Sequence, residues 1–380
     1  MSPDTLAIYV HWPFCRSKCP YCDFNSHVRE SIDEERWLRA YLAELDGFAR
    51  EIAARPVGSV FFGGGTPSLM RPQTTAAILD RIAARWPRVP DVEVTLEANP
   101  STAEAQRFRD FRDAGVGRLS IGVQSLDDAA LRFLGRGHSA VEARAAVALA
   151  AAVFPRFSFD LMWGWPGHDL SAWQGQLGEA LAMAGEHLST YQLTIEPGTG
   201  FWRDGVPAAG EDLSCDLHEA TLEMLAANGL PAYEISNHAR PGAECRHNLA
   251  VWQGGDYLGI GPGAHGRLTT HGRTEAMRAL KSPEKWLARV EGVGSGLAER
   301  VALTPAERRE ELMFSGLRLT RGIDRERFRS LSGVEPEAAV DADALSTMID
   351  GGFVESDPAG LRATAAGLLR LDAVLARLLA

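Results

Sequence analysis

The 380-residue chain lacks three features that would place it in common functional classes. It has no apolar run near the roughly 18–20 residues that span a membrane, because Arg or Glu interrupts its Ala-rich stretches. It also lacks an excess of positive charge, and a formal net charge of −11 argues against a large phosphate-binding surface. The start of the chain shows no export signal. We therefore expect a cytoplasmic protein without a transmembrane segment or a nucleic-acid partner, although peripheral contact with a membrane stays open.

Cysteine is scarce and unevenly distributed. Three of the five Cys form a C-x3-C-x2-C pattern at Cys15, Cys19 and Cys22. Grouped thiols of this kind suggest metal binding in a reducing compartment rather than a disulfide framework. Three thiolates on one loop can hold three irons of a [4Fe–4S] cluster. No fourth Cys follows, since Asp23 and Phe24 succeed Cys22, so the fourth iron could bind a small molecule.

Two other interpretations of this loop stay open. Structural zinc usually has four protein ligands, and His11 or Asp23 could join the three Cys as the fourth. The loop could also hold a structural or electron-transfer iron–sulfur cluster. That interpretation is the least favoured, because a cluster of this kind is usually closed by four Cys.

Strand-like and helix-like segments alternate over the first half of the chain. Strands are expected at residues 6–11, 60–62, 92–96, 119–123, 157–161 and 189–195. Helices are expected between them at residues 33–54, 74–85, 103–114, up to about 152, and 170–184. Six strand–helix units predict a parallel sheet covered by helices. Right-handed crossovers would curl this α/β sheet into a partial (β/α)6 barrel.

Polar or glycine-rich residues follow each expected strand. They are the Cys loop, the glycines at 63–65, Glu97, Gln124, Asp160 and Glu196. Barrel-like α/β folds gather their active sites at this end of the strands. Plain alternatives exist: the glycines could form a tight turn, Glu97 could cap a helix, and Arg136 could be solvated. Together these residues could bind the hydroxyl and charged groups of a ligand.

The second half of the chain is less regular. A helix near 214–228 precedes a Gly-rich polar stretch at 247–266 and a candidate hinge at 292–296. Further helices are expected at residues 305–319, 325–331 and 342–350, followed by a hairpin between 353 and 363 and a last helix to 380. This order is typical of a winged-helix-like module. We divide the chain into a partial barrel (1–200), a barrel extension (201–295) and a mainly helical C-terminal module (296–380).

The run from Tyr9 to Cys22 resembles the radical SAM superfamily. In that superfamily the open iron chelates S-adenosylmethionine (SAM), and an electron from the cluster cleaves the sulfonium to methionine and a 5′-deoxyadenosyl radical. Further motifs resemble the HemN/HemW branch: G-G-G-T-P-S at 63–68, E-A-N-P at 97–100, G-V-Q-S at 122–125, D-L-M-x-G-x-P at 160–166 and G-I-G-P-G-A-H at 259–265. The likeness covers nearly the whole chain.

The resemblance implies a set of binding residues. Cys15, Cys19 and Cys22 would ligate the cluster, and Tyr21 within the loop is a further candidate cofactor contact. A first SAM would lie among Tyr9, Gly64, Glu97 and Thr194. A second SAM-sized ligand would contact Gly65, Thr66, Gln124, Arg136 and Asp160.

Two features favour the HemW type within this branch. The oxidase type carries a further Cys where this chain has Phe24. The first expected strand also begins almost at once, without the N-terminal extension that the oxidase uses for its substrate.

The residues around His247 resemble the H-N-x-x-Y-W element that is linked with heme in the HemW type, with Val251 in place of Tyr. By this likeness His247 is a candidate axial ligand, Cys245 is a candidate heme contact, and Trp252 could lie against a porphyrin face. The alternative is a His-Asn pair that anchors an irregular loop.

The chain departs from the branch's usual G-L-P-x-Q turn, which here is Gly-Trp-Pro-Gly-His at 164–168. Trp163 and Trp165 could reshape the pocket or cap its core. His168 and His265 are candidate polar contacts, with packing roles as the alternative. Cys215 has no functional neighbour in the sequence, and we expect it to be buried like an apolar residue.

The resemblance implies a cytoplasmic heme chaperone of the HemW type. It would bind a [4Fe–4S] cluster, SAM and heme, receive electrons from a donor, and pass heme to an acceptor protein. The alternative is a radical SAM enzyme that acts on a porphyrin, either an oxygen-independent coproporphyrinogen III oxidase or a HemN-like methylase. We expect the radical machinery to be present and the oxidase activity to be absent.

Overall fold

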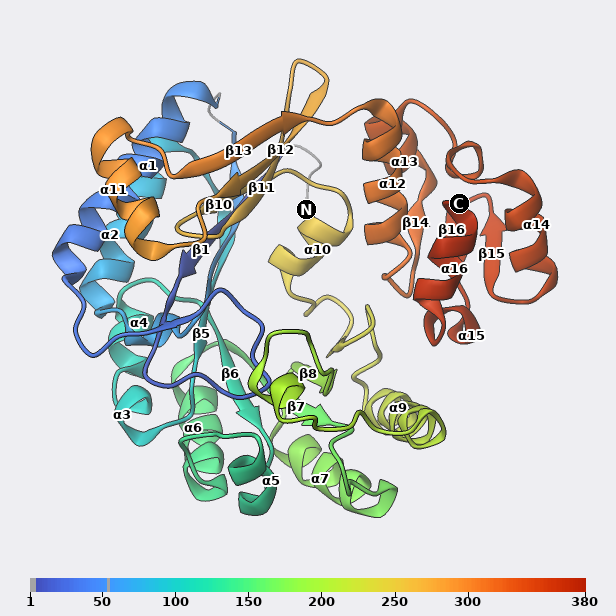
Figure 1. Cartoon of the computed structure of the whole chain (residues 1–380), viewed down its shortest axis with the longest axis horizontal. Helices are drawn as coiled ribbons and strands as arrows, with labels where there is room; N and C mark the ends of the chain where they lie inside the picture. Colours follow the sequence, from blue (N-terminus) through green and yellow to red (C-terminus); the bar gives the residue numbers. More distant parts are fainter. Residues whose placement is uncertain (1–4, 53–54) are drawn as a thin grey trace.

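The structure is a computed structural model that describes residues 5–52 and 55–380 (Figure 1). Its largest feature is a mixed sheet whose strands follow the order β13-β12-β11-β10-β1-β4-β5-β6-β7-β8-β9. The six central strands are β1 (Leu6–Trp12), β4 (Val57–Gly64), β5 (Arg88–Ala98), β6 (Arg118–Gln124), β7 (Arg156–Trp163) and β8 (His187–Gln192). Each pairs in parallel with the next.

This arrangement confirms the expected partial barrel. All six predicted strands are present, and the sheet stays open because β13 and β9 lie at its two edges. Strand lengths differ from expectation at individual ends. The last predicted strand stops at Gln192 rather than near residue 195, and β4 begins three residues earlier than the apolar run suggested.

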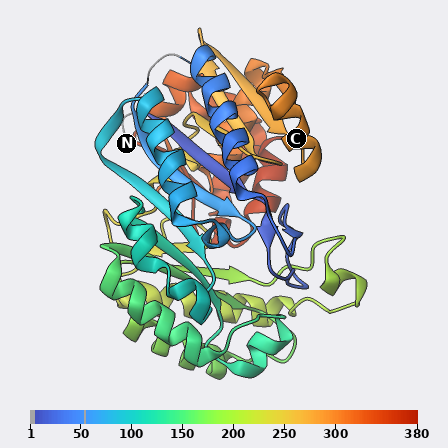
Figure 2. The ribbon, with the colours of Figure 1, turned by 90° about the vertical axis from the view of Figure 1, so that its left-hand side faces the viewer.

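Helices cover the outer face of the sheet (Figure 2). They are α1 (Glu34–Glu51), α2 (Pro72–Arg85), α3 (Thr102–Ala105), α4 (Phe108–Asp113), α5 (Asp128–Phe133), α6 (Ala140–Val153) and α7 (Leu170–Met183). The single helix expected over 103–114 is therefore wrong, since it is broken into α3 and α4. Short elements near the strand ends are β2 (Phe14–Cys15), β3 (His27–Val28), η1 (Pro67–Leu69) and α8 (Gly200–Arg203).

The two faces of the sheet differ in chemistry. Alternate residues of a strand point to opposite faces, and on β5 Val94 and Leu96 belong to the apolar core. Glu93, Thr95 and Glu97 alternate with them and face the barrel interior. This strand therefore presents polar side chains to the barrel interior, and Glu97 near its carboxyl end is part of the site described below.

The barrel extension continues the sheet beyond β1. β10 pairs in parallel with β1, and the strands after it pair antiparallel. Its elements are α9 (Glu211–Ala227), β9 (Asn237–Ala239), α10 (Arg246–Trp252), β10 (Tyr257–Ile260), β11 (His265–Thr270), β12 (Arg273–Ala279), α11 (Pro283–Val293) and β13 (Leu297–Ala302). The expected hinge at 292–296 connects α11 to β13. The irregular stretch expected from residue 247 is wrong at its start, where the chain forms α10.

The C-terminal module has its own apolar core, which includes Met313, Phe328 and Leu361. Its elements are α12 (Pro305–Gly316), β14 (Ile323–Asp324), α13 (Arg325–Ser332), η2 (Pro336–Ala339), α14 (Ala342–Asp350), β15 (Val354–Asp357), β16 (Gly360–Ala363), α15 (Ala365–Leu368) and α16 (Leu371–Leu378). Its sheet has the order β14-β16-β15. The expected helices and hairpin are present, and the division of the chain at residues 200 and 295 stays a prediction.

Two further findings concern single features. No helix in the described part of the chain is both long and apolar enough to cross a membrane. Cys215 lies on α9 and is exposed, so the expectation that it is buried is wrong. The buried face of α9 is formed by other residues, such as Leu217 and Leu225, and Cys215 lies on the solvent side.

Candidate functional site

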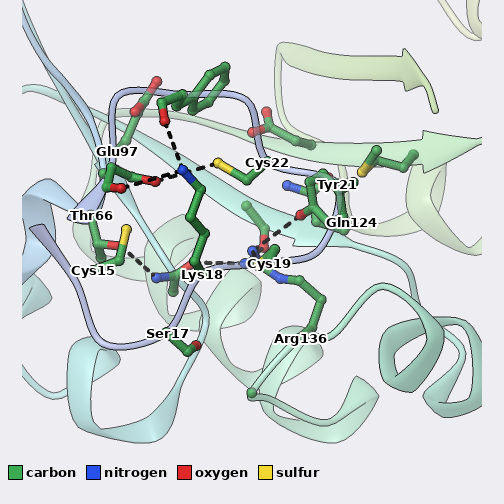
Figure 3. A pocket seen from close by; sticks show the side chains of 18 of the residues that line it. Cys15, Ser17, Lys18, Cys19, Tyr21, Cys22, Thr66, Glu97, Gln124 and Arg136 are labelled. Carbon is green, nitrogen blue, oxygen red and sulfur yellow. Dashed lines mark hydrogen bonds between the residues drawn. The ribbon is translucent and has the colours of Figure 1, made fainter. Parts of the chain in front are cut away.

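A cavity of about 510 Å³ opens at the carboxyl ends of the parallel strands (Figure 3). Its lining includes most of the residues predicted from the sequence, namely Cys15, Cys19, Tyr21, Cys22, Gly64, Gly65, Thr66, Glu97, Gln124, Arg136, Asp160 and Thr194. Tyr9 and His247 are not part of it. Six strands and the Cys loop therefore bring to one place residues that are up to 179 positions apart, from Cys15 to Thr194.

The Cys loop is fixed at both ends. The Asn25 side-chain amide donates hydrogen bonds to the carbonyls of Pro262 (2.9 Å) and Lys281 (3.0 Å). On the other side, the backbone N–H of Phe201 donates to the carbonyl of Pro20 at 2.8 Å. The loop is therefore held between the barrel extension and the segment that follows β8.

All three sulfurs have a hydrogen-bond partner, since the Ser26 hydroxyl lies 3.7 Å from Cys22 Sγ and donors reach the other two. The Thr66 hydroxyl donates to Cys15 Sγ at 3.3 Å, and Arg136 Nη1 donates to Cys19 Sγ at 3.3 Å. Arg136 Nη2 also donates to Asn99 Oδ1 and to the Gly122 carbonyl, both at 2.7 Å. The solvated alternative for Arg136 is therefore wrong. Such donors stabilise thiolates and tune the reduction potential of a bound cluster.

The zinc interpretation finds little support in this geometry. Across residues 5–52 and 55–380, no three His, Cys, Asp or Glu side chains are placed to share a single metal ion. His11, one proposed fourth ligand, is already engaged: its Nδ1 lies 3.1 Å from the Tyr9 hydroxyl, and its Nε2 lies 3.0 Å from the Asn25 carbonyl. Three thiols around an open cavity fit a larger inorganic group with one free position.

The glycines at 63–65 have a packing role that the sequence did not reveal. Gly64 has a φ of +112°, and a Cβ there would lie 2.6 Å from His11 Cε1. A Cβ on Gly65 would lie 2.7 Å from the Phe14 carbonyl oxygen. Both residues must therefore be glycine for the Cys loop to sit against β4, in addition to their exposure to the cavity.

Two partly buried carboxyl groups, Glu97 and Asp160, line the cavity. Burial and the nearby charge of Asp160 raise the pKa of Glu97 to about 8. Burial likewise raises the pKa of Asp160 to about 6, against the opposing effects of Ser189 and Arg118. Glu97 also accepts a hydrogen bond from the backbone N–H of Gly64 at 3.2 Å. Such a pair favours a ligand that brings a positive charge or hydroxyl donors.

Gln124 adopts a left-handed backbone conformation, which is uncommon for a residue other than glycine. Its φ is +69°, one of few positive values at non-glycine residues in the described chain. Its side-chain Oε1 is buried and has no hydrogen-bond partner among the described residues. Strained residues and unpaired buried acceptors are concentrated at binding sites. Gln124 therefore offers a ready acceptor to a ligand in the cavity.

Tyr9 lies in the barrel interior below the cavity, with its ring centre 6.2 Å from that of His247. His247 lies on α10, and its Nδ1 is 3.1 Å from the Ser59 hydroxyl oxygen. Burial lowers the pKa of His247 to about 4, so the imidazole is neutral. His247 is buried and does not line the cavity, and its assignment as a heme ligand stays a prediction.

Cys245 precedes α10 and is also buried. Its Sγ lies 3.7 Å from Glu93 Oε1, and burial raises the pKa of its thiol to about 11. The predicted contact of Cys245 with heme is likewise untested by this geometry.

The residues that depart from the branch pattern mainly pack. The rings of Trp165 and His168 stack with their centres 3.8 Å apart, and His168 Nδ1 accepts a hydrogen bond from the Gly164 N–H at 3.2 Å. Trp163 belongs to the main apolar core. His265 is exposed at the start of β11.

Two residues of the site escaped the sequence analysis. Asn99 connects Thr66 to Arg136, since its amide donates to the Thr66 hydroxyl at 3.2 Å and its carbonyl accepts from Arg136. Arg118 is buried in the barrel interior, where its charge lowers the pKa of Asp160. Asn99 lies within the E-A-N-P motif, and Arg118 lies at an inward-facing position of β6. Both positions could have indicated a role in the site from the sequence alone.

Comparisons with known proteins identify the family and support the fold. The radical SAM superfamily model matches residues 9–175, and the HemN C-terminal domain model matches residues 303–370. Radical S-adenosyl methionine domain-containing protein 1, mitochondrial, from Bos taurus is 40% identical over 98% of this chain and 87% of its own length. Heme chaperone HemW from Escherichia coli is 44% identical over 70% of each chain.

The chain belongs to the HemW family of the radical SAM superfamily. Membership in the superfamily implies a [4Fe–4S] cluster and SAM. Among solved structures, that of HemN, the coproporphyrinogen III oxidase of Escherichia coli, matches with a TM-score of 0.83 over 99% of this chain and 90% of the other. At 21% identity this likeness shows that the HemW family chain has the HemN fold.

Proposed function

We propose that this HemW family chain is a heme chaperone: it binds heme and passes it to an acceptor protein. Cys15, Cys19 and Cys22 would hold a [4Fe–4S] cluster, and the lack of a fourth Cys ligand would leave it able to bind SAM. The observation that carries the proposal is a three-thiolate loop, without a fourth Cys, that faces a ligand-sized cavity in a chain similar to the heme chaperones HemW. When bound, the cluster supplies one electron to SAM.

The chain's own residues prepare the cavity for SAM. Glu97 and Asp160 offer partly buried acceptors for the ammonium and ribose hydroxyl groups. Gln124 offers its unpaired carbonyl oxygen. Thr66 and Arg136 stabilise the thiolates of Cys15 and Cys19 by hydrogen bonds.

The remaining partners follow from the same proposal. Three free thiols at a cofactor site require a reducing compartment such as the cytoplasm. An electron donor must reduce the cluster, and an acceptor protein must take the heme. The alternative function, a radical enzyme that acts on a porphyrin, draws its support from the HemN-like fold alone.

A combined assay separates the two functions. Anaerobically reconstituted protein is titrated with heme, and the same preparation receives coproporphyrinogen III, SAM and a reductant. We expect a shift of the Soret band, transfer of heme to a heme-free acceptor, and unchanged coproporphyrinogen. Absence of heme uptake, or conversion of coproporphyrinogen to protoporphyrinogen, would overturn the proposal.

A matched pair of Cys variants checks the cluster in this assay. Cys19→Ala removes a thiolate that lines the cavity, whereas Cys215→Ala removes an exposed thiol on α9. We expect only Cys19→Ala to lose the iron–sulfur absorption.

A further inference from the structure

A second cavity, of about 520 Å³, lies between α10 and the C-terminal module. It is separate from the cavity at the strand ends, with which it shares no lining residue. Figure 1 shows α10 between the sheet and the module, with α12 on the facing side. Cavities of roughly 300–1,000 Å³ commonly bind small molecules. The size of this cavity therefore suits an organic ligand.

Part of the wall of this second cavity is apolar. Leu249 from α10 faces Leu312, Leu319, Phe328 and Leu331 from the module. Such walls favour the flat apolar body of a ligand over a small polar metabolite.

Trp252 adds an aromatic ring to the same wall. The guanidinium of Arg318 lies 4.5 Å from the centre of this ring. The indole Nε1 is buried and has no hydrogen-bond partner among the described residues. Trp252 is therefore held in place by Arg318 while it lines the cavity.

One edge of the second cavity carries Arg321 and Arg327, which form no salt bridge within the described residues, although the charges of Asp324 and Asp256 act on Arg327. Arg327 Nε donates to the Gln253 carbonyl at 2.7 Å. Within the described residues, neither its terminal nitrogens nor the Arg321 side chain forms a hydrogen bond or an ion pair. Asp324 is the acidic residue of the lining, and it accepts a hydrogen bond from the Arg327 backbone N–H at 2.8 Å as a helix cap.

The two arginines also affect each other. Burial lowers the pKa of Arg327, the charge of Asp324 opposes this effect, and the neighbouring charge of Arg321 lowers the pKa further. Two adjacent guanidinium groups whose terminal nitrogens have no acceptor among the described residues form a site for an anion, and a guanidinium suits a carboxylate.

We propose that the second cavity binds heme, with the tetrapyrrole against the apolar walls and the two propionates at Arg321 and Arg327. This inference rests on the proposed heme function and assigns that function a location. Heme has an apolar ring with two carboxylates on one edge. The second cavity has apolar side chains in its wall and two arginines on one edge.

The proposal has a chemical consequence for the iron. The described lining of the second cavity contains no His, Cys, Met or Tyr, so the protein offers no common axial ligand there. His247 contacts Ser59 in the barrel interior instead. The affinity of this site therefore depends on the ring and its carboxylates rather than on the metal.

Three probes test the proposal on the full chain. They are heme, metal-free protoporphyrin IX, and the dimethyl ester of protoporphyrin IX, which lacks both negative charges. We expect heme and protoporphyrin IX to bind with dissociation constants within a few-fold of each other. We expect the ester to bind at least about tenfold more weakly, because it loses its charge-assisted hydrogen bonds.

Variants of the cationic edge provide the second test. Arg321→Ala should weaken the binding of heme by about tenfold and leave the binding of the ester unchanged. Arg327→Ala should also weaken the binding of heme, but it additionally removes the hydrogen bond to the Gln253 carbonyl, so the Arg321 variant decides the test. Arg329→Ala is the matched control, because Arg329 lies on α13 like Arg327 but pairs with Glu335. Arg321→Glu reverses the charge at an exposed residue that makes no hydrogen bond within the described residues, so the fold should be kept. We expect this variant to bind heme more weakly than Arg321→Ala does.

The outcomes separate this inference from the proposed function. If the wild-type chain binds heme and the arginine variants bind it equally well, the site lies elsewhere while the chaperone function stands. The proposed heme site is also overturned if binding requires iron. It is overturned likewise if binding is lost in His247→Ala but kept in the arginine variants. If the wild-type chain binds no heme, the proposed function fails.

Discussion

Single residues in this chain determine whether the Cys loop can reach the cavity. Gly64 and Gly65 allow His11 and Phe14 to approach β4 within distances that a Cβ would block. Sequence analysis placed these glycines at the site but gave them the role of approaching a ligand. Their packing role depends on residues of β1 and the Cys loop, and it could not be read without the structure.

We expect Gly64→Ala to destabilise the folded chain by about 2–4 kcal/mol, because the new Cβ meets His11 and the backbone has a positive φ. Gly175→Ala is the matched control. Gly175 lies in α7 with no atom within 4 Å of its Cβ position, so alanine should stabilise the helix by about 0.5–1 kcal/mol. Chemical denaturation measures both values. Equal stability of the two variants would contradict this account of Gly64.

Glu97 should make the stability of the ligand-free protein depend on pH. Its pKa is about 8 in the folded protein and about 4.5 in the unfolded chain. The folded state therefore binds the extra proton, and the stabilisation that is present below pH 4.5 is lost as the pH rises through 8.

The variant Glu97→Gln removes this proton linkage while it keeps an acceptor for the Gly64 N–H. We expect the variant and the wild type to be similarly stable near pH 5, and the variant to be more stable by roughly 1–3 kcal/mol at pH 8. Urea denaturation at the two pH values measures the difference. A constant difference between the two proteins at both pH values would refute the predicted linkage.

At the scale of elements, the central strands could be predicted because their apolar runs and following polar residues are local signals. The helix expected over 103–114 could not be placed correctly for a tertiary reason. Glu104, Phe108 and Phe111 would share one face of a continuous helix. The break between α3 and α4 lets Glu104 accept a hydrogen bond from the Asn99 N–H at 3.0 Å while both Phe residues enter the core.

Helix α10 is the second element that local sequence did not predict. It has seven residues, and its first N–H groups are satisfied by a residue far away in the sequence. Glu93 Oε1 accepts hydrogen bonds from the N–H groups of Arg246 (2.8 Å) and His247 (3.4 Å). Glu93 also forms a salt bridge with Arg156. The position of His247 thus follows from a contact between β5 and α10.

We expect Glu93→Ala to loosen α10 and to destabilise the chain by about 2–4 kcal/mol, because Arg156 loses a buried partner and the helix loses its cap. Amides of residues 246–252 should exchange hydrogen faster. Asp91→Ala is the matched control: its carboxylate pairs with Arg246 at the surface, where solvent screens the pair, and its loss should change stability far less. Unchanged exchange in the Glu93 variant would show that α10 does not depend on this contact.

For the whole molecule, the partial barrel could be predicted from the sequence because strand and helix patterns alternate along it. The C-terminal module could be predicted because helical patterns are followed by a hairpin pattern. The sequence did not suffice to predict how the module is held. Arg308 donates to the Gly254 carbonyl at 2.6 Å, and Arg327 donates to the Gln253 carbonyl at 2.7 Å. Side chains that bind distant backbone carbonyls leave no periodic pattern, and the cavity between α10 and the module depends on them.

The central claim at this scale is a cluster with one iron left open for SAM by three thiolates. Electron paramagnetic resonance of the anaerobically reconstituted and reduced protein, recorded with and without SAM, tests it most directly. We predict about four irons per chain and a [4Fe–4S] signal whose g-values change when SAM is added. Zinc in place of iron, or a cluster signal that SAM leaves unchanged, would contradict the account.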